Sequence, residues 1–320
     1  MTERASTFGS SAYGGDGWSP RQRSLADELG TVWAACGMDN EWNTLRSVLV
    51  HRPGVELEAS TDPKSVQMLE PIDVVRAGDE HDAMSAAFES NGVCVHRVDP
   101  AVVPPPNQMF CADLMFATPE GVILARPAST VRAGEERQVA RRLADLGVPI
   151  VRTIGAEATF EGADAAWLDT ETVVVGRGMR TNSDGIDQIA ETLLWQDVDV
   201  LDVDMPFGTM HLMGMLRIVD RNLAVAWPRR TPYALVIALR ERDYEVVFLP
   251  EVDEYDMNRA MNFVTLGPRH ILMESGYRAV QSVFESAQIE CVTVEATELI
   301  KAAGGFGCLT GVLQRDAVGS

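Results

Sequence analysis

The sequence predicts an α/β protein, and more specifically a five-bladed αβ propeller made of pseudo-fivefold ββαβ repeats. One observation is that an amphipathic helix followed by an apolar strand recurs five times, about every fifty residues. Another is that a two-strand hairpin pattern precedes four of the five helices. The first unit shows only one strand before its helix, and one strand at the C-terminus is unclaimed. A closed ring would pair these two strands and leave fewer strand edges exposed.

The hairpin half of each unit consists of two short apolar runs joined by a polar turn. The paired runs are 114–117 with 122–125, 166–168 with 173–175, 216–219 with 223–226, and 263–265 with 271–273. The first unit shows only the run 45–51, and we expect the C-terminal run 308–313 to be its partner. This pairing would close the ring.

The helix-and-strand half of each unit shows apolar residues at helical spacing, then a turn, then an alternating or continuous apolar run. The five matches are residues 81–98, 137–152, 186–203, 232–249 and 278–294. Alternating strands and helices are also typical of a doubly wound parallel sheet, which is the alternative architecture. The regular repeat favours the ring.

The chain divides into an N-terminal extension and one larger domain. Residues 41–320 are expected to form a single catalytic αβ-propeller domain, because 46% of the chain is hydrophobic and a ring of repeats can reach this length as one domain. Residues 1–18 are rich in Gly, Ser and Thr, which is typical of disorder. Ser19 and Pro20 then give the start signal of a helix that we expect to run to about Cys36. The extension 1–40 is therefore predicted to be disordered and then helical.

Composition and charge exclude several classes of protein. No apolar run reaches the length that crosses a membrane. A net charge of −20 argues against nucleic-acid binding and permits cationic small-molecule substrates. The five cysteines form an odd set without a CxxC pair or metal-ligand spacing, which favours a reducing compartment. We therefore expect a cytoplasmic protein with a small-molecule partner and no nucleic acid or membrane partner, and a homodimer is compatible with the sequence.

Polar residues fall at equivalent places in the repeats, and a ring would bring them together near its axis. Asp113 enters a strand of the second unit, Glu161 and Asp164 precede the third, His211 opens the fourth, and Cys308 begins the closing strand. Taken singly, each has an ordinary structural explanation, because ionisable groups often cap turns or sit satisfied in a core. Their joint placement points to a site.

Cys308 is the strongest candidate for a reactive thiol. The ordinary alternative is a buried and inert cysteine, which is the commonest fate of this residue. Gly304, Gly305 and Gly307 lie just before it, and they would let the backbone approach a ligand closely, which a core strand does not need. The cysteines interpreted as structural are Cys36, Cys94 and Cys291, and Cys111 is less clear because it lies close to Asp113.

Seven short motifs together carry a resemblance to a known group of enzymes. They are Val50-His-Arg-Pro-Gly54, Glu80-His81-Asp82, the segment from Asn107 to Asp113, Phe160-Glu-Gly-Ala-Asp164, Arg180-Thr-Asn182, Met210-His-Leu212 and Gly304-Gly-x-x-Cys308. The chain resembles the guanidine-modifying (pentein) superfamily over about residues 41–314. That superfamily includes arginine deiminases, dimethylarginine dimethylaminohydrolases and arginine amidinotransferases, and its fold is a five-bladed αβ propeller.

The resemblance implies a catalytic role for four residues. Cys308 as a thiolate would attack the guanidinium carbon and form a covalent thiouronium adduct. Asp113 would accept hydrogen bonds from two guanidinium N–H groups and orient the carbon toward the sulfur. His211 would protonate the departing amine and then activate water. Glu161 would hold His211 or share the contact with the guanidinium.

Five further residues are implied to bind the substrate. Arg132 and Arg180 resemble arginines that grip an α-carboxylate, although Arg132 also fits an ordinary surface charge at a helix start. Asn107 resembles a residue at the amino-acid end, and Asp164 belongs to the same motif as the catalytic glutamate. The fifth is Met213, where deiminases and amidinotransferases usually carry an aspartate. A thioether there removes a charge and offers an apolar wall, which suits an N-substituted guanidinium.

The predicted function is a cysteine-dependent hydrolase of the guanidinium group of arginine or an N-substituted arginine, giving citrulline and ammonia or an amine. No metal or organic cofactor is implied, because a thiolate, carboxylates and an imidazole cover every step. The first alternative is an amidinotransferase, and the segment Glu41-Trp42-Asn-Thr-Leu45 resembles such enzymes. The second is a non-catalytic protein that binds a guanidino ligand.

Overall fold

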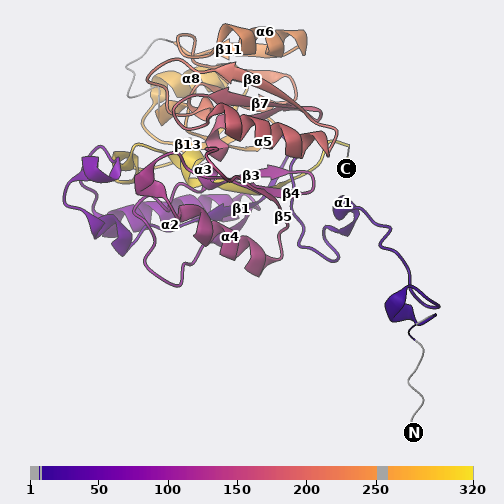
Figure 1. Ribbon diagram of the computed structural model, residues 1–320. Helices are drawn as coiled ribbons and strands as arrows, with labels where there is room; N and C mark the ends of the chain where they lie inside the picture. Colours follow the sequence, from indigo (N-terminus) through magenta and orange to yellow (C-terminus); the bar gives the residue numbers. More distant parts are fainter. Residues whose placement is uncertain (1–6, 8, 251–258, 320) are drawn as a thin grey trace.

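Five three-stranded sheets surround one axis in the computed structural model, which describes residues 7, 9–250 and 259–319 (Figure 1). In every sheet the middle strand pairs antiparallel with one neighbour and parallel with the other. The predicted five ββαβ blades are confirmed, and the doubly wound alternative is wrong because no sheet extends beyond three strands within these residues.

Four blades are formed by consecutive stretches of the chain. Their hairpins are β3 and β4 (Met115–Thr118, Gly121–Leu124), β6 and β7 (Ala165–Asp169, Thr172–Arg177), β9 and β10 (Leu216–Asp220, Leu223–Ala226), and β12 and β13 (Val264–Gly267, His270–Glu274). The helices and third strands that follow are α4 and β5 (Glu135–Leu146, Ile150–Thr153), α5 and β8 (Ser183–Leu194, Asp199–Asp204), α6 and β11 (Tyr233–Glu241, Glu245–Phe248), and α8 and β14 (Arg278–Ser286, Glu290–Val294).

The remaining blade joins the two ends of the chain. Its middle strand, β1 (Leu45–Val50), pairs antiparallel with the C-terminal β15 (Gly311–Arg315). On its other side β1 pairs parallel with β2 (Cys94–Arg97), which follows helix α2 (Val74–Ser90). The strand that lacked a hairpin partner therefore finds it at the C-terminus, as the sequence predicts.

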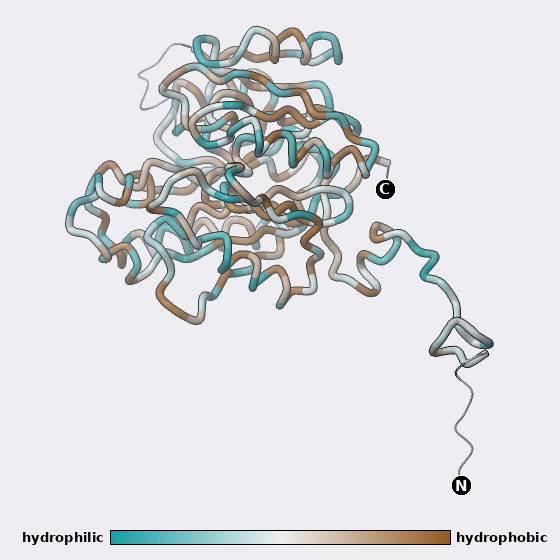
Figure 2. Tube along the Cα trace, viewed as in Figure 1, coloured by the Kyte–Doolittle hydropathy of each residue, from teal (hydrophilic) through white to brown (hydrophobic). Residues whose placement is uncertain are grey.

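Burial follows strand position within each blade. The middle strands are almost wholly buried, because they run between two neighbours and carry apolar side chains on both faces; β4 and β10 have no exposed residue. The third strands are partly exposed and more polar. In Figure 2 the strands contain brown, apolar segments, and brown and teal alternate along the outer helices.

The first strand of each hairpin, together with β15, lies next to the axis. A cavity of about 70 Å³ is lined by residues from all five of these strands, including Phe116, Ala166, Arg217, Val264 and Val312. Because one small cavity touches every blade, the channel along the axis is narrow. The segments that precede the inner strands therefore lie close together at one end of the ring.

Short helical turns precede the inner strand in four of the five blades. They are α3 (Cys111–Leu114), η5 (Gly162–Asp164), η6 (Leu212–Gly214) and α9 (Phe306–Leu309). The predicted strand 308–313 is therefore wrong at its start, because Cys308 lies in α9 and the strand begins at Gly311. The turn is held by hydrogen bonds from the Leu309 N–H to the Gly305 carbonyl (3.1 Å) and from the Thr310 hydroxyl to the Phe306 carbonyl (2.7 Å).

The N-terminal extension contains less helix than predicted. The expected helix from Ser19 to about Cys36 is wrong: α1 spans only Leu25–Glu28, capped by Ser24. The helix ends at Leu29, whose backbone is extended, and the chain then turns at Gly30 with a positive φ of 74°. Figure 1 shows the chain before α1 running away from the ring, whereas Ala34, Gly37 and Met38 form backbone hydrogen bonds with the blades. Part of the predicted disordered stretch, residues 1–6 and 8, lies outside the described residues.

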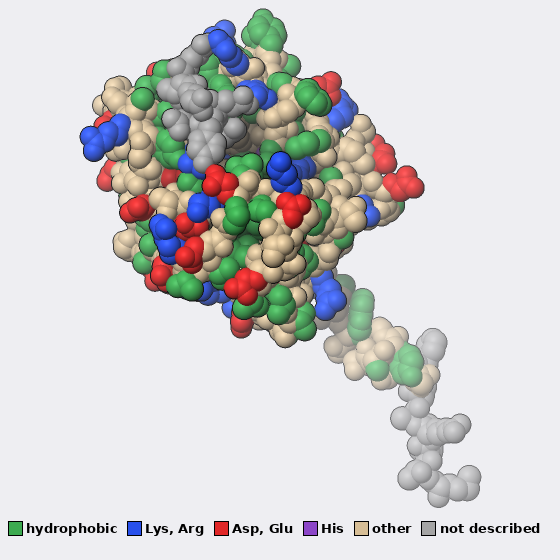
Figure 3. All heavy atoms as spheres, turned by 90° about the vertical axis from the view of Figure 1, so that its left-hand side faces the viewer, with side chains coloured by type: hydrophobic (Ala, Val, Ile, Leu, Met, Phe, Trp, Pro, Cys, Tyr) green, Lys and Arg blue, Asp and Glu red, His purple; other side chains and the backbone are tan. Residues whose placement is uncertain are grey.

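The other short helical segments lie in loops. They are η1 (Ser11–Tyr13), η2 (Val55–Ala59), η3 (Pro63–Val66), η4 (Thr130–Arg132) and η7 (Leu299–Ala302). Among the residues that the structure describes, every helix is too short or too polar to traverse a lipid bilayer. On the face drawn in Figure 3, acidic and basic side chains are interspersed with apolar ones, so the negative charge is not gathered there in one patch.

Gly162 allows two of the site-bearing turns to pack closely, which gives a first testable prediction. A Cβ at this position would lie 2.1 Å from the Met115 carbonyl oxygen and 2.5 Å from that of Ala112, and neither backbone atom can move aside cheaply. We expect Gly162→Ala to lower the free energy of unfolding in a denaturant titration by about 1–3 kcal/mol or more.

The matched control is Gly155→Ala, because no atom lies within 4 Å of a Cβ built there. We expect it to change the free energy of unfolding by less than about 0.5 kcal/mol. Equal stability of the two variants would show that the turn before β6 is not tightly packed against α3.

Candidate active site

Four candidate residues from four turns meet at one end of the ring. Asp113 lies in α3, Glu161 stands directly before η5, His211 directly before η6, and Cys308 lies in α9. All four are buried, with at most 5% of each residue exposed. The sequence predicted this convergence because each residue occupies the same place in its repeat.

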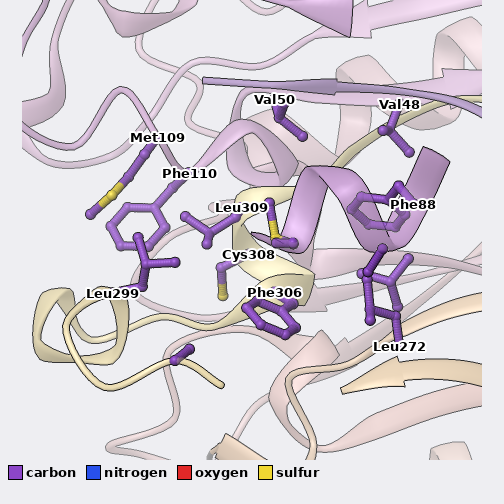
Figure 4. Close-up of a cluster of buried hydrophobic side chains, with 14 of the residues drawn as sticks. Val48, Val50, Phe88, Met109, Phe110, Leu272, Leu299, Phe306, Cys308 and Leu309 are labelled. Carbon is purple, nitrogen blue, oxygen red and sulfur yellow. The ribbon is translucent and has the colours of Figure 1, made fainter. Parts of the chain in front are cut away.

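Cys308 sits at the boundary between the core and the site. It belongs to a buried apolar cluster with Phe306 and Leu309 of its own turn and with Phe110 (Figure 4). Its sulfur nevertheless has polar neighbours: the Asn262 amide nitrogen lies 3.0 Å from Sγ, and the Met213 thioether lies 3.8 Å away. Cys308 also lines two cavities, so its thiol is not enclosed by packing alone.

The other cysteines differ from Cys308 in their surroundings. Burial raises the pKa of Cys36 and Cys291 to about 11, and burial followed by the charges of Glu135 and Asp113 raises the pKa of Cys111 still further. Cys94 is exposed, and all five cysteines are free. The thiolate is the nucleophilic form, so Cys36, Cys111 and Cys291 are poorly suited to attack.

His211 is held between two carboxylates. Its Nε2 lies 2.7 Å from the Glu161 carboxylate and its Nδ1 lies 3.8 Å from Oδ1 of Asp113. Burial disfavours the imidazolium, but the charge of Asp113 and hydrogen bonds with Cys308 and Glu161 outweigh burial and raise the pKa of His211 well above 6.5. His211 is therefore suited to carry a proton at neutral pH.

Arg132 is placed among protein carboxylates. Its Nη1 lies 2.6 Å from Asp113 and 3.2 Å from Glu161, and its Nε and Nη2 donate to one oxygen of Glu135 at 3.0 and 2.8 Å. Arg132 is buried, which rules out the alternative of a surface charge. In this structure its guanidinium binds carboxylates of the protein, whereas the sequence predicted that it would grip a substrate carboxylate.

Two of the carboxylates that pair with Arg132, those of Glu161 and Glu135, differ in their pKa. Burial would raise the pKa of Glu161, but His211, Arg132 and Arg180 together hold it well below its usual range. Burial raises the pKa of Glu135 to about 7 despite its ion pair with Arg132. Glu161 is therefore the anion that stabilises the imidazolium of His211.

Asp113 retains one unpaired oxygen. Oδ2 accepts the hydrogen bond from Arg132, while Oδ1 is buried without a hydrogen-bond partner among the described residues. A buried carboxylate oxygen without a donor is costly. Oδ1 is thus the acceptor that remains free for the N–H group of a ligand, and it faces His211.

Asp164 does not line the cavities beside the thiol, contrary to its predicted role in substrate binding. Its Oδ2 accepts a hydrogen bond from the Thr181 hydroxyl at 2.7 Å, and its Oδ1 accepts one from the Leu212 N–H at 3.1 Å. Burial raises its pKa to about 7. Both oxygens serve the protein, so Asp164 positions the loop that carries His211.

Two cavities meet at Cys308. The smaller, about 20 Å³, is lined by Asn107, Arg180, Arg132 and Asp113. Asn107 donates to the Val66 carbonyl at 2.8 Å, and Arg180 lies 3.3 Å from Glu161. The larger cavity, about 210 Å³, is lined by mostly apolar residues together with several polar ones; they include Leu69, Met210, Met213, His211, Arg259 and Asn262.

The donor set also raises the question of a metal ion. One atom each of Asp113, Glu161 and His211 lie within 4.8 Å of one another, a grouping found once in the part of the chain that the structure describes. Imidazole and carboxylate suit several divalent metals. However, Arg132 is ion-paired with both carboxylates, so the position between them is taken by a guanidinium group.

Two residues that contact the candidate groups were missed by the sequence analysis. Asn262 contacts Cys308 through both ends of its amide, and Glu135 holds Arg132. The signal for Asn262 was its place just before the inner strand of the fifth repeat, equivalent to that of the other candidates. The signal for Glu135 was its place three residues after Arg132, a spacing at which opposite charges often pair.

A family model and a known protein each match most of the chain. The family model described as "N,N dimethylarginine dimethylhydrolase, eukaryotic" matches residues 60–314. The uncharacterized protein YkgA of Bacillus subtilis is 24% identical over 84% of this chain and 92% of its own length.

Two solved structures have the same fold. A cysteine variant of the dimethylarginine dimethylaminohydrolase of Pseudomonas aeruginosa, in complex with citrulline, has a TM-score of 0.70 at 19% identity, covering 85% of this chain and 100% of that one. An amidinotransferase of a saxitoxin biosynthetic pathway from Microseira wollei has a TM-score of 0.69 at 15% identity, covering 88% and 98%.

Proposed function

The chain belongs to the eukaryotic N,N-dimethylarginine dimethylhydrolase family, within the guanidine-modifying superfamily, and from this we propose that it is a cysteine-dependent hydrolase of N-substituted arginines. The products would be citrulline and an amine. The observation that carries the proposal is the convergence of Cys308, His211 and Asp113, with one oxygen of Asp113 left unpaired. That oxygen can accept an N–H group of a guanidinium.

In the first step, the thiolate of Cys308 would attack the central carbon of the guanidinium. The guanidinium donates to Oδ1 of Asp113, which orients the carbon and shares the positive charge. The bond from carbon to the substituted nitrogen then breaks, and the imidazolium of His211 gives its proton to the departing amine. The raised pKa of His211 supports this role, because the proton is in place before the reaction begins.

In the second step, the thiouronium adduct would be hydrolysed. His211, now neutral, takes a proton from water, and the resulting hydroxide attacks the carbon of the adduct. The bond from carbon to sulfur breaks, the thiolate returns, and the hydroxyl proton passes to solvent, which leaves the neutral ureido group of citrulline. Glu161 keeps the imidazole oriented through its 2.7 Å contact with Nε2 in both steps.

The amino-acid part of the substrate would lie along the smaller cavity. Asn107 and Arg180 line it, and Arg180 is suited to an α-carboxylate because its side-chain contact among the described residues is a long one, 3.3 Å to Glu161. The N-substituent would lie toward Met213, which borders the larger cavity and touches the sulfur. The amino-acid end and the N-substituent of the substrate would therefore lie in different cavities.

Met213 is expected to set the preference for substituted guanidines. Met213→Asp would place a second carboxylate beside the guanidinium and remove an apolar wall, which favours unsubstituted arginine. We expect the ratio of kcat/KM for arginine to that for dimethylarginine to rise at least about tenfold, corresponding to about 1.4 kcal/mol. Met213→Leu keeps the apolar wall and is expected to leave the ratio within about threefold. An unchanged ratio in Met213→Asp would refute this role for Met213.

An amidinotransferase is the second candidate, because the transferase from Microseira wollei shares this fold and the larger cavity of about 210 Å³ has room for an acceptor amine. In that reaction ornithine would leave first, and the amidino group would pass from Cys308 to the acceptor. A non-catalytic guanidino-binding protein is less consistent with a paired His211 and Glu161.

All five cysteines are free thiols, which favours a cytoplasmic location for the protein.

The test is to supply arginine, monomethylarginine and dimethylarginine with and without acceptor amines, and to follow citrulline and ornithine. Citrulline formed without an acceptor is the expected result. Ornithine formed only when an acceptor is present would establish the transferase instead. Absence of both products, with binding of the ligands by calorimetry, would establish the non-catalytic alternative.

A further inference from the structure

We propose that Asn262 is a catalytic residue of this site, donating a hydrogen bond to the sulfur of Cys308 and thereby stabilising the thiolate. The inference rests on the proposed function for the identity of the nucleophile. Asn262 lies directly before Phe263 and the inner strand β12, and it is buried. Its Nδ2 is 3.0 Å from Sγ of Cys308, the atom that forms and breaks a bond in the reaction.

The orientation of the Asn262 amide is fixed by its other end. Oδ1 accepts a hydrogen bond from the backbone N–H of Cys308 at 2.9 Å. A backbone N–H can only donate, so the atom facing it must be the oxygen, and the NH₂ group must face the sulfur. One side chain therefore contacts both the backbone and the thiol of the same residue.

The glycines before Cys308 make room for this contact. A Cβ at Gly307 would lie 2.8 Å from Oδ1 of Asn262, and one at Gly305 would lie 3.1 Å from its Cβ. The backbone carbonyl of Asn262 also accepts the N–H of Gly307 at 3.0 Å. The glycine-rich motif therefore admits the Asn262 side chain. Gly304 and Gly305 also line the larger cavity, so the expected close approach of a ligand stays a prediction.

The proposed effect depends on how strongly the thiol and the thiolate each accept a hydrogen bond. A neutral thiol is a weak acceptor, whereas a thiolate is an anion, and a hydrogen bond to a charged group is the stronger kind. A donor fixed at 3.0 Å therefore binds the thiolate more strongly than the thiol. Met213 has no N–H or O–H group to donate, so the donors to the sulfur are the Asn262 amide and His211, which also forms a hydrogen bond with Cys308.

The charged groups around the nucleophile come from several elements. His211 stands before η6, Asp113 lies in α3, Arg132 ends η4, Arg217 lies in β9, and Glu274 ends β13 close to Gly305. All of them are unchanged when Asn262 is replaced. A difference in Cys308 reactivity between the wild type and an Asn262 variant therefore reports the effect of the Asn262 side chain.

Asn262→Asp is the sharpest test, because it keeps the oxygen that holds the Cys308 N–H and replaces the donor by an acceptor. The measurement is the rate of iodoacetamide alkylation of Cys308 at neutral pH, read on its peptide by mass spectrometry. We expect the rate to fall about tenfold or more, while exposed Cys94 in the same sample reacts unchanged. Dimethylarginine turnover is expected to show a similar fall in kcat with KM within about twofold.

Asn91→Asp is the matched control, because Asn91 ends α2 and its amide bonds only the Ala87 carbonyl among the described contacts. In this variant, the alkylation of Cys308 and the turnover of dimethylarginine should proceed at wild-type rates. Asn262→Ala provides a second test if the aspartate variant fails to fold, and it should lower the Cys308 alkylation rate without adding a charge. Wild-type alkylation of Cys308 in a folded Asn262 variant would overturn the proposal. Failure of the proposed function would instead appear as absence of turnover in the wild type, with the alkylation contrast intact.

Discussion

Cys308→Ser is expected to abolish citrulline formation, lowering kcat by about 10⁴ or more, because a serine hydroxyl at this site lacks the nucleophilicity of a thiolate. The replacement changes one atom of a buried side chain, so the fold should persist. Binding should persist too, since Asp113 and Arg180 are untouched, and the dissociation constant for citrulline should stay within a few-fold of the wild-type value. Turnover is measured as citrulline released, and binding by calorimetry.

Cys94→Ser is the control for that experiment. Cys94 lies in the outer strand β2 of the first blade and is exposed, so this variant should retain full activity. Citrulline formation by Cys308→Ser at more than a few per cent of the wild-type rate would show that another group attacks the guanidinium. Loss of citrulline binding in the same variant would show that the site itself had collapsed.

His211→Asn is expected to lower kcat by about 10²–10⁴, because the variant cannot protonate the departing amine or activate water. The pH dependence gives a second readout. The raised pKa of His211 keeps the imidazolium populated through neutral pH, so activity should fall only as the pH rises through that raised value. Both quantities come from initial rates measured across a pH series.

Glu161→Gln distinguishes the two carboxylate partners of His211. The variant removes the anion at 2.7 Å from Nε2, which should lower the pKa of His211 toward 6.5. The alkaline fall in activity should therefore move to lower pH, while the charge of Asp113 still acts on the ring. An unchanged pH profile in Glu161→Gln would mean that Glu161 does not control the protonation of His211.

The architecture was predictable because its signals are repeated. Each blade repeats an apolar hairpin and a helix, so an error in one unit is corrected by the other four. The strand β1 needed a partner, and only closure of the ring could supply β15. The N-terminal helix had no such support: Ser19 and Pro20 are local signals, and the chain follows the capping box of Ser24 instead.

Periodicity could not resolve the structure around the nucleophile. A short apolar run such as Cys308–Leu309 fits a strand or one turn of helix equally well, and here hydrogen bonds to Gly305 and Phe306 select the turn. This turn places the sulfur of Cys308 beside the amide of Asn262.

For the candidate site, the meeting of its residues was easier to predict than their contacts. Cys308, His211 and Asp113 were expected to lie close together because they recur at one place in the repeat. The direction of the Arg132 side chain was not, because it depends on carboxylates contributed by other segments, including Glu161 from the next blade. A buried guanidinium is drawn to buried carboxylates, and sequence spacing does not record which of them lie nearby.

Mass spectrometry of the Cys308 peptide tests the central claim most directly. The protein is His211→Asn, mixed with the S-methyl isothiourea analogue of citrulline and quenched with acid. The analogue releases methanethiolate, which needs no proton from His211, whereas hydrolysis of the adduct still needs the base. We predict that Cys308 accumulates an adduct that retains the whole amino-acid chain. An adduct that has lost the amino-acid chain and keeps the methylthio group would show that ornithine leaves first, as in the transferase, and an unmodified Cys308 in a sample that releases methanethiol would contradict covalent catalysis by this residue.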